Sequence, residues 1–106
     1  MFQLHPAPTF NAKVKLTVPG QETPAEVDFT FKHKTRTAID DWTDRLSTER
    51  DPGKEAPLLM EVIAGWGVGN DLSEANLATL LDNYPASGGE LVRGYLRAIT
   101  ESRAKN

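Results

Sequence analysis

Histidine and serine are the residue types in this sequence that most often act in catalysis, and their spacing argues against such a role here. His5 and His33 are the two histidines, and neither belongs to a metal-binding pattern such as HExxH. Ser73 and Ser87 lack the GxSxG turn that presents a nucleophilic serine. We expect His33 to be a structural residue at the end of a strand, and Ser73 to cap a helix.

Carboxylates cluster at the start of a predicted helix, where Asp40, Asp41 and Asp44 follow one another closely. Asp40 and Asp44 would share one helix face and offer the oxygen ligands that a hard cation prefers. Acidic residues near a helix N-terminus also complement the helix dipole and are commonly solvated. We expect this second role, and therefore no metal site.

Gly65, Gly67 and Gly69 invite comparison with nucleotide-binding loops. Their spacing is GxGxG, and Asn70 stands where GxGxxG has its third glycine. The run also follows a predicted helix, whereas the dinucleotide fingerprint follows a strand. We therefore expect a glycine-rich helix end, and the sequence predicts no cofactor, no catalytic residue and no enzymatic activity.

Four aromatic residues on predicted helix faces have a further role to assign: Trp42, Trp66, Tyr84 and Tyr95. One interpretation is that they build the core, because large apolar side chains in a small domain tend to be buried. The other is that some of them form a partner-binding groove, since Trp and Tyr are enriched at the centres of interfaces. Trp66 is the strongest candidate because it stands at a predicted helix end beside the glycine run.

Composition excludes several classes of protein. The 106 residues carry 12 Lys and Arg against 15 Asp and Glu, so nucleic acid and anionic membranes are not expected as main partners. The absence of cysteine excludes a disulfide framework and fits a reducing compartment. No apolar run reaches the roughly 20 residues that span a bilayer, and residues 1–10 lack the pattern of a secretion signal. We expect one soluble cytoplasmic domain over residues 1–106.

The elements that would position these residues change from strands to helices along the chain. Residues 12–18 and 25–33 alternate apolar and polar side chains with the period of half-buried strands. An antiparallel hairpin would pair two lysines with two carboxylates on the solvent face, namely Lys13 and Lys15 with Glu26 and Asp28. Phe2 and Leu4 would add a short third strand or a flap over the sheet.

Helical periodicity begins near Thr35. The first expected helix has a capping box at Thr37 and Asp40 and stops at residues 51–53. The second starts at Pro57 and carries Trp66, the third lies between Ser73 and Pro85, and the last follows a break at Gly88 and Gly89. Arg93 and Arg97 are expected to face solvent on the last helix. Strands followed by helices predict an α+β fold with an N-terminal hairpin and about four helices.

The order of residues resembles the small tail assembly chaperones of long-tailed bacteriophages and prophages from about Pro8 to Asn106. No single motif carries this resemblance, which depends on the order and spacing of the following residues: Pro8 and Phe10; Val18, Pro19 and Gly20; Phe29, Thr30, Phe31, Lys32, His33, Lys34 and Thr35; Trp42; Ile63, Ala64, Gly65 and Trp66; Leu77, Leu80, Leu81, Tyr84 and Pro85; Tyr95; Arg103, Lys105 and Asn106.

The resemblance implies a non-enzymatic helper in the host bacterial cytoplasm. It would keep the long tape-measure protein soluble and help tail tube subunits to polymerise around it, and it would be absent from the finished virion. Helix faces near Trp66, Tyr84 and Tyr95 would hold amphipathic segments of the tape measure, and self-association is left open.

Two other functions are alternatives at this stage. The first is a minor structural tail or head–tail joining protein that is retained in the virion, because fold alone does not determine function. The second is a regulator that binds nucleic acid through Arg93, Arg97, Arg103 and Lys105, against which the net charge of -3 argues.

The resemblance also implies a longer form made by ribosomal frameshifting near the stop codon. Ala104, Lys105 and Asn106 can be encoded as GCA AAA AAC, which contains the slippery sequence A AAA AAC. The alternative is that these residues are an ordinary polar end after a helix. The codons of the gene distinguish the two.

Overall fold

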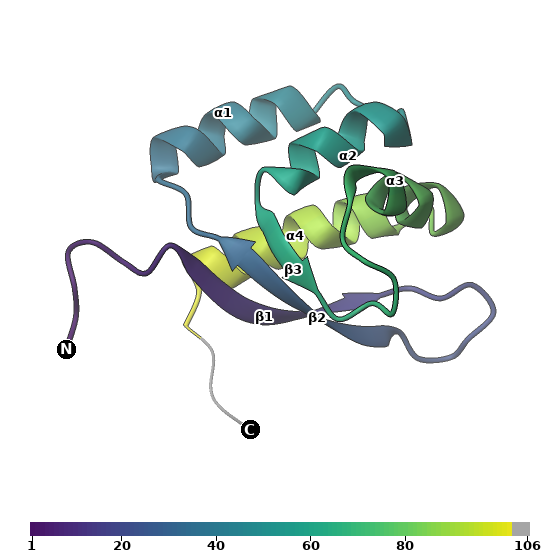
Figure 1. Ribbon diagram of the computed structural model, residues 1–106, viewed down its shortest axis with the longest axis horizontal. Helices are drawn as coiled ribbons and strands as arrows, with labels where there is room; N and C mark the ends of the chain where they lie inside the picture. The colour runs from purple at the N-terminus through teal and green to yellow at the C-terminus, as the bar shows by residue number, and fades with distance from the viewer. Residues whose placement is uncertain (103–106) are drawn as a thin grey trace.

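An antiparallel hairpin begins the fold in the computed structural model, which describes residues 1–102. β1 (Thr9–Leu16) pairs with β2 (Ala25–Lys32), and alternate residues of both strands are buried. Lys13 lies opposite Asp28, with 2.8 Å between Nζ and Oδ1, and Lys15 lies opposite Glu26. The predicted hairpin and its register are confirmed (Figure 1).

The third strand comes from a part of the chain that its periodicity assigns to a helix. β3 (Ile63–Trp66) pairs antiparallel with β2, which gives the strand order β1-β2-β3. The prediction of a helix that carries Trp66 is therefore wrong, because α2 (Pro52–Met60) ends before this strand. The β-branched side chains of Val62 and Ile63 favour the extended conformation at this point.

Phe2 and Leu4 add neither a strand nor a flap, in contrast to the prediction. Phe2 and Leu4 are 94 % and 85 % exposed, and residues 1–7 extend away from the body of the molecule (Figure 1). Pro6 and Pro8 have no backbone N–H to donate, which disfavours strand pairing in this segment.

Within residues 1–102, four helices complete the α+β fold that the sequence predicts, and two of them begin with side-chain caps from Thr or Ser. In α1 (Arg36–Leu46) the cap is Thr35 rather than the predicted Thr37, since Oγ1 of Thr35 accepts from Ala38 N at 3.2 Å. In α3 (Glu74–Asn83) the cap is Ser73, as predicted.

The starts of the other two helices differ from the prediction. Asp51 caps α2, so Pro52 begins a helix where a loop is expected, and Pro57 lies inside the helix. Proline fits the first turn of a helix because N–H groups there have no acceptor within the helix, so the N–H that proline lacks is not needed. Gly88 and Gly89 lie inside α4 (Ser87–Thr100) and do not break it.

One hydrophobic core lies between the helices and one face of the sheet. α4 packs on β1, and α3 packs against α2. Figure 1 shows α1 and α2 beside the β3 edge and α4 behind the sheet. The core is formed by these buried side chains: Val14, Leu16, Phe29, Phe31, Trp42, Leu46, Ala56, Leu59, Val62, Ile63, Leu77, Leu81, Leu91 and Tyr95.

The packing of α4 on β1 depends on a glycine. A Cβ atom at Gly94 would lie 2.9 Å from Cγ2 and 3.1 Å from Cγ1 of Val14, which is 3 % exposed. Val14 is stiff and part of the sheet, so it has little freedom to move away. Gly94 therefore sets how closely the helix approaches the strand.

We expect Gly94→Ala to lower the free energy of unfolding by about 1–2 kcal/mol, because overpacking outweighs the gain in helix propensity. Gly89→Ala is the matched control, since a Cβ there would meet only the flexible guanidinium of Arg93. It should leave stability unchanged or raise it by up to about 1 kcal/mol. Urea denaturation measures both. Equal stability of the two variants would show that α4 can shift away from β1 without cost.

Candidate functional site

The four aromatic residues singled out from the sequence divide into two pairs. Trp42 and Tyr95 are both 0 % exposed and lie edge to face, with ring centroids 5.3 Å apart. Trp66 and Tyr84 are partly buried and line the same surface groove. The first pair therefore offers no accessible surface, while the second pair does.

Both buried rings have partners for their polar ends. Nε1 of Trp42 donates to the carbonyl oxygen of Leu58 at 2.7 Å, and the hydroxyl of Tyr95 donates to the carbonyl oxygen of Lys32 at 2.8 Å. Burial raises the pKa of Tyr95 to about 12. These contacts join α1 to α2 and α4 to β2, so the two residues hold the layers of the fold together.

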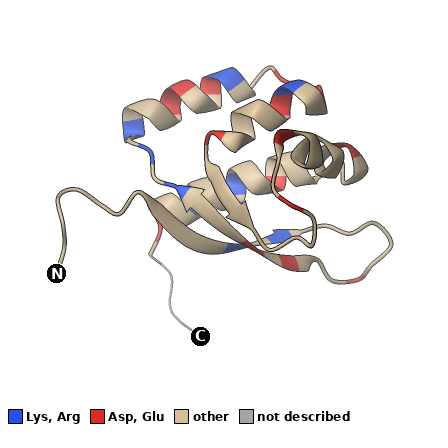
Figure 2. Cartoon of the chain, in the orientation of Figure 1, with Lys and Arg blue, Asp and Glu red and all other residues tan. Residues whose placement is uncertain are grey.

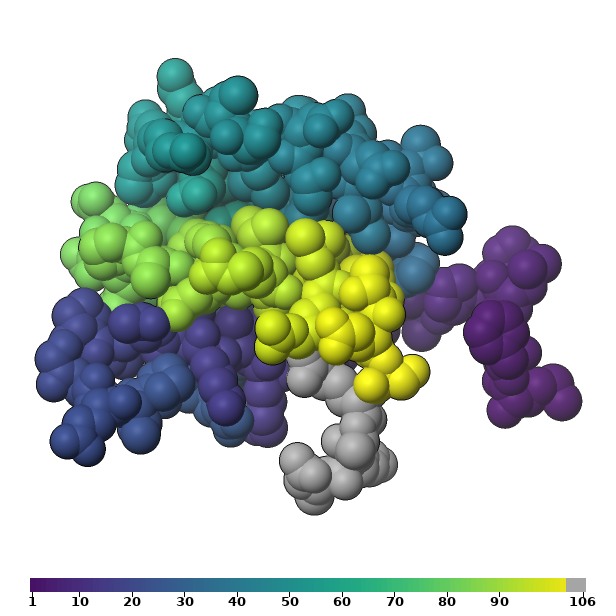
Figure 3. Space-filling model, turned by 180° about the vertical axis from the view of Figure 1, so that it is seen from behind, coloured from purple at the N-terminus to yellow at the C-terminus, as the bar shows by residue number. Residues whose placement is uncertain are grey.

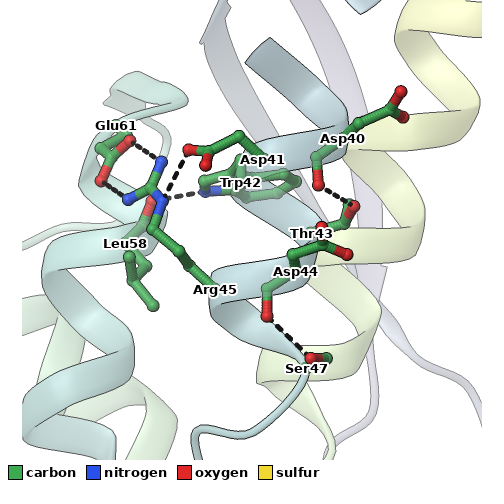
Figure 4. A network of polar contacts seen from close by, with 9 residues as sticks. All are labelled: Asp40, Asp41, Trp42, Thr43, Asp44, Arg45, Ser47, Leu58 and Glu61. Atoms are coloured by element: carbon green, nitrogen blue, oxygen red, sulfur yellow. Dashed lines mark hydrogen bonds and ion pairs between the residues drawn. The ribbon is translucent and has the colours of Figure 1, made fainter. Parts of the chain in front are cut away.

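An ion-pair network fixes α1 beside the turn that leads into β3 (Figure 4). The Arg45 guanidinium donates from Nη1 and Nη2 to the carboxylate of Glu61, at 2.6 and 2.8 Å, and from Nε to Asp41 at 2.9 Å. The two hydrogen bonds from Nη1 and Nη2 of Arg45 hold the pKa of Glu61 below its ordinary value. Of the three clustered aspartates, Asp41 therefore has a structural role in this network rather than a role in ligand binding.

This network predicts an acid-sensitive contribution to stability. The pKa of Glu61 is lower in the folded chain than in the unfolded chain. The ionised Glu61 therefore stabilises the folded chain at pH values above the ordinary carboxyl pKa, and this stabilisation is lost as the pH falls through the folded pKa. We expect Arg45→Gln to remove that part of the acid dependence. Thermal unfolding between pH 3 and pH 7 measures it, with Arg36→Gln as a control for the loss of one charge. An unchanged acid slope in Arg45→Gln would contradict the prediction.

The groove that Trp66 and Tyr84 share has a volume of about 370 Å³ and lies between the hairpin, β3 and α3. The described residues that line it are all uncharged: Leu16, Val18, Ala25, Val27, Trp66, Val68, Asn70, Asn76, Thr79, Leu80, Asn83 and Tyr84. We call this surface the Trp66 groove. Figure 2 shows charged residues on the neighbouring elements but none on β3.

Hydrogen bonds fix the loop that closes the Trp66 groove. Nε1 of Trp66 donates to the carbonyl oxygen of Asn70 at 2.8 Å, and Nδ2 of Asn76 donates to the backbone carbonyl oxygen of Asp71 at 2.7 Å. The glycine run predicted to end a helix thus lies partly in β3 and partly in this loop. A preformed apolar groove with amide groups at its rim is suited to binding an apolar segment of another protein.

The sequence did not identify the hairpin and α3 residues of the groove. Leu16 and Val27 belong to the apolar face of the strands, and Leu80 belongs to the apolar face of α3. Val68, an isolated apolar residue between two glycines, was the signal that could have drawn attention to the loop.

The other residues considered for chemistry remain separate from one another. Within residues 1–102 no three His, Asp or Glu side chains lie close enough together to hold a metal ion. His33 is exposed at the end of the hairpin. No helix in the same part of the chain is long and apolar enough to cross a membrane.

Arg93 and Arg97 are exposed on α4, as predicted. The other two basic residues of the nucleic-acid alternative, Arg103 and Lys105, lie outside the described residues. The same is true of Ala104 and Asn106, on which the frameshift hypothesis depends.

Comparison with known proteins gives one family. The family model described as phage tail assembly chaperone matches residues 1–106. No curated protein and no solved structure gives a significant match to the chain. Because the match covers every residue, it confirms the resemblance seen in the sequence: the chain belongs to the phage tail assembly chaperone family and is not an enzyme.

Proposed function

We propose that this chaperone binds the tape-measure protein and assists polymerisation of the tail tube in the cytoplasm of the host bacterium. Membership of the tail assembly chaperone family is the observation that carries the proposal. The chain would act as a single unit over residues 1–106, with no cofactor and no role for nucleic acid.

The Trp66 groove is the proposed docking site for apolar segments of the tape measure. Among the described residues, its lining combines aliphatic side chains with two partly buried aromatic rings and no charge. An amphipathic helix would place its apolar face in such a groove and leave its polar face in water. Trp66 and Tyr84 are the proposed contact residues, whereas Trp42 and Tyr95 are buried in the core and do not line the groove.

A chaperone must release its client, and the size of the groove is consistent with reversible binding. Burial of apolar surface contributes about 25 cal/mol per Å², from which the costs of association and side-chain ordering are subtracted. A groove of about 370 Å³ accommodates a few side chains at a time. Many weak sites along a long client would keep it soluble without trapping it.

The direct test is calorimetry between the full chain and overlapping segments of the tape-measure protein encoded in the same genome. We expect micromolar association with segments that have an apolar helical face, and none with segments that lack it. If no tape-measure segment binds, the proposed client is wrong.

Mass spectrometry of purified virions distinguishes this function from that of a structural tail or head–tail joining protein. A chaperone should be absent from the particle but present in infected cells. Abundant copies in the virion would favour the structural role.

A further inference from the structure

β1 is an edge strand, and the register shows which of its backbone groups are free. Opposed residues in an antiparallel ladder alternate between pairs that exchange two hydrogen bonds and pairs that exchange none. One step beyond the pair Thr9↔Lys32, the N–H of His33 donates to the carbonyl oxygen of Pro8 at 2.8 Å. The even-numbered residues of β1 therefore bond to β2.

The opposite edge of β2 confirms this alternation. The N–H of Lys32 donates to the carbonyl oxygen of Val62 at 2.7 Å, and the carbonyl oxygen of Asp28 accepts from Gly67 N at 2.7 Å. The N–H of Lys32 and the carbonyl of Asp28 therefore point toward β3 and not toward β1. Thr9 and Lys13, which lie opposite Lys32 and Asp28 on β1, do not bond to these groups.

Consequently the backbone N–H and C=O groups of Asn11, Lys13 and Lys15 point away from the sheet. Within residues 1–102 none of them has a backbone partner outside the β1–β2 ladder. The next donor along this edge is satisfied: the N–H of Thr17 donates to the two carboxylate oxygens of Glu90 at 3.0 and 3.1 Å. Thus a side chain of α4 caps the end of an otherwise open edge.

A trough runs along this open edge, with α4 as its floor. It consists of two hollows of about 270 and 520 Å³ that both involve Lys13, Lys15 and Ala98. Ala98 lines both hollows, and its small side chain leaves space above the helix. We call this surface the β1 trough. Figure 3 shows α4 across the back of the molecule, next to the hairpin.

The charges in the two hollows differ. The hollow nearer to Thr17 contains four basic side chains, Lys13, Lys15, Arg93 and Arg97, and one carboxylate, Glu90, which already bonds to Thr17. Lys13 pairs with Asp28, and no ion pair within residues 1–102 involves the other three cations. The second hollow also contains Glu26 and Glu101, so its charge is balanced.

We infer that the β1 trough binds an extended segment of a partner protein as a fourth strand, with Asp or Glu side chains placed against Arg93 and Arg97. The outward groups of Asn11, Lys13 and Lys15 supply the main-chain hydrogen bonds of strand addition. The unpaired guanidinium groups select carboxylates at the end near Thr17. This surface is distinct from the Trp66 groove, and the inference does not depend on the proposed client.

A second copy of the chain does not fit this edge. Paired strands lie about 4.8 Å apart, whereas packed helices need about 8–10 Å between their axes. Because α4 packs beneath β1 itself, pairing of two β1 strands would bring two α4 helices into the same space. A single extended segment has no such conflict.

Amide hydrogen exchange followed by NMR on the full chain tests the inference. The probe is a blocked peptide of alternating Val and Glu at about 1 mM, a concentration suited to weak binding. In the free chain, the amides of Asn11, Lys13 and Lys15 should exchange much faster than those of Ala12 and Val14. The peptide should slow exchange at these odd-numbered positions by at least tenfold, whereas a Val–Lys peptide should not.

Variants separate the two parts of the site. Lys15→Pro removes an outward N–H without removing a β1–β2 bond and should abolish binding, while its matched control Lys15→Gln retains the donor. Arg93→Gln with Arg97→Gln should weaken binding of the Glu peptide by tenfold or more and leave the fold unchanged. Binding that survives Lys15→Pro, no protection by the peptide, or odd-numbered amides already protected in the free chain would each overturn the inference.

Discussion

Replacing Tyr95 with alanine is expected to lower the free energy of unfolding by about 3–5 kcal/mol, which is the usual cost of removing a buried aromatic ring. Tyr95 is 0 % exposed, and its ring lies edge-on to those of Phe31 and Trp42, with centroids 5.1 and 5.3 Å away. The cavity would therefore open between α4, the sheet and α1. A domain of this size has only about 5–15 kcal/mol of stability, so the variant should be close to unfolding at 37 °C. Chemical denaturation measures the loss.

Tyr95→Phe is the matched control for this prediction. It keeps the ring and removes only the hydrogen bond to the carbonyl oxygen of Lys32, so we expect a loss of about 1 kcal/mol. If Tyr95→Ala were as stable as Tyr95→Phe, the ring would not be part of the core. Its role would then have to be sought in partner binding, the other interpretation that the sequence permits.

The sequence predicts well those elements whose pattern has a single explanation. Alternation in residues 12–18 and 25–33 requires strands with one buried face, and opposite charges on the outer face fit the hairpin register. Ser73 is a good cap just before a helical apolar pattern, and it caps α3. In each case local chemistry and burial favour the same structure.

β3 shows where such reasoning fails. Apolar residues from Leu58 to Trp66 have the spacing of a helix face, yet α2 ends at Met60 and residues 63–66 form a strand. Periodicity in a short apolar run does not distinguish the two structures. The strand is decided by pairing with β2, a contact between segments distant in the sequence, which local spacing does not encode.

The candidate site could be predicted only in part for a related reason. Trp42, Trp66, Tyr84 and Tyr95 all lie in apolar patterns, so the sequence does not separate the two buried residues from the two that line the groove. The difference comes from tertiary packing: α1 and α4 enclose one pair, while the hairpin and α3 leave the other pair partly open. The lack of charge in the groove is likewise a property of several elements together.

That lack of charge leads to the largest expected effect on function. Leu80→Glu places a carboxylate in a groove where no charged residue within residues 1–102 is available to pair with it. A bound apolar segment would cover this carboxylate, and burial of an unpaired charge is strongly unfavourable. We expect association with tape-measure segments to weaken roughly hundredfold or more, which corresponds to about 3 kcal/mol. Calorimetry on the full chain measures the change.

Two further variants determine whether the effect belongs to the Trp66 groove. Ala75→Glu adds the same charge to an exposed position of α3 outside the groove and should bind as the wild type does. Thr79→Glu adds it at an exposed position on the groove rim, where folding is little affected, and should weaken binding by roughly tenfold. Since each of the three variants adds one carboxylate, a general effect of net charge would weaken binding equally in all of them. If Leu80→Glu and Thr79→Glu remained folded and both retained wild-type affinity, the client would have to bind at another surface.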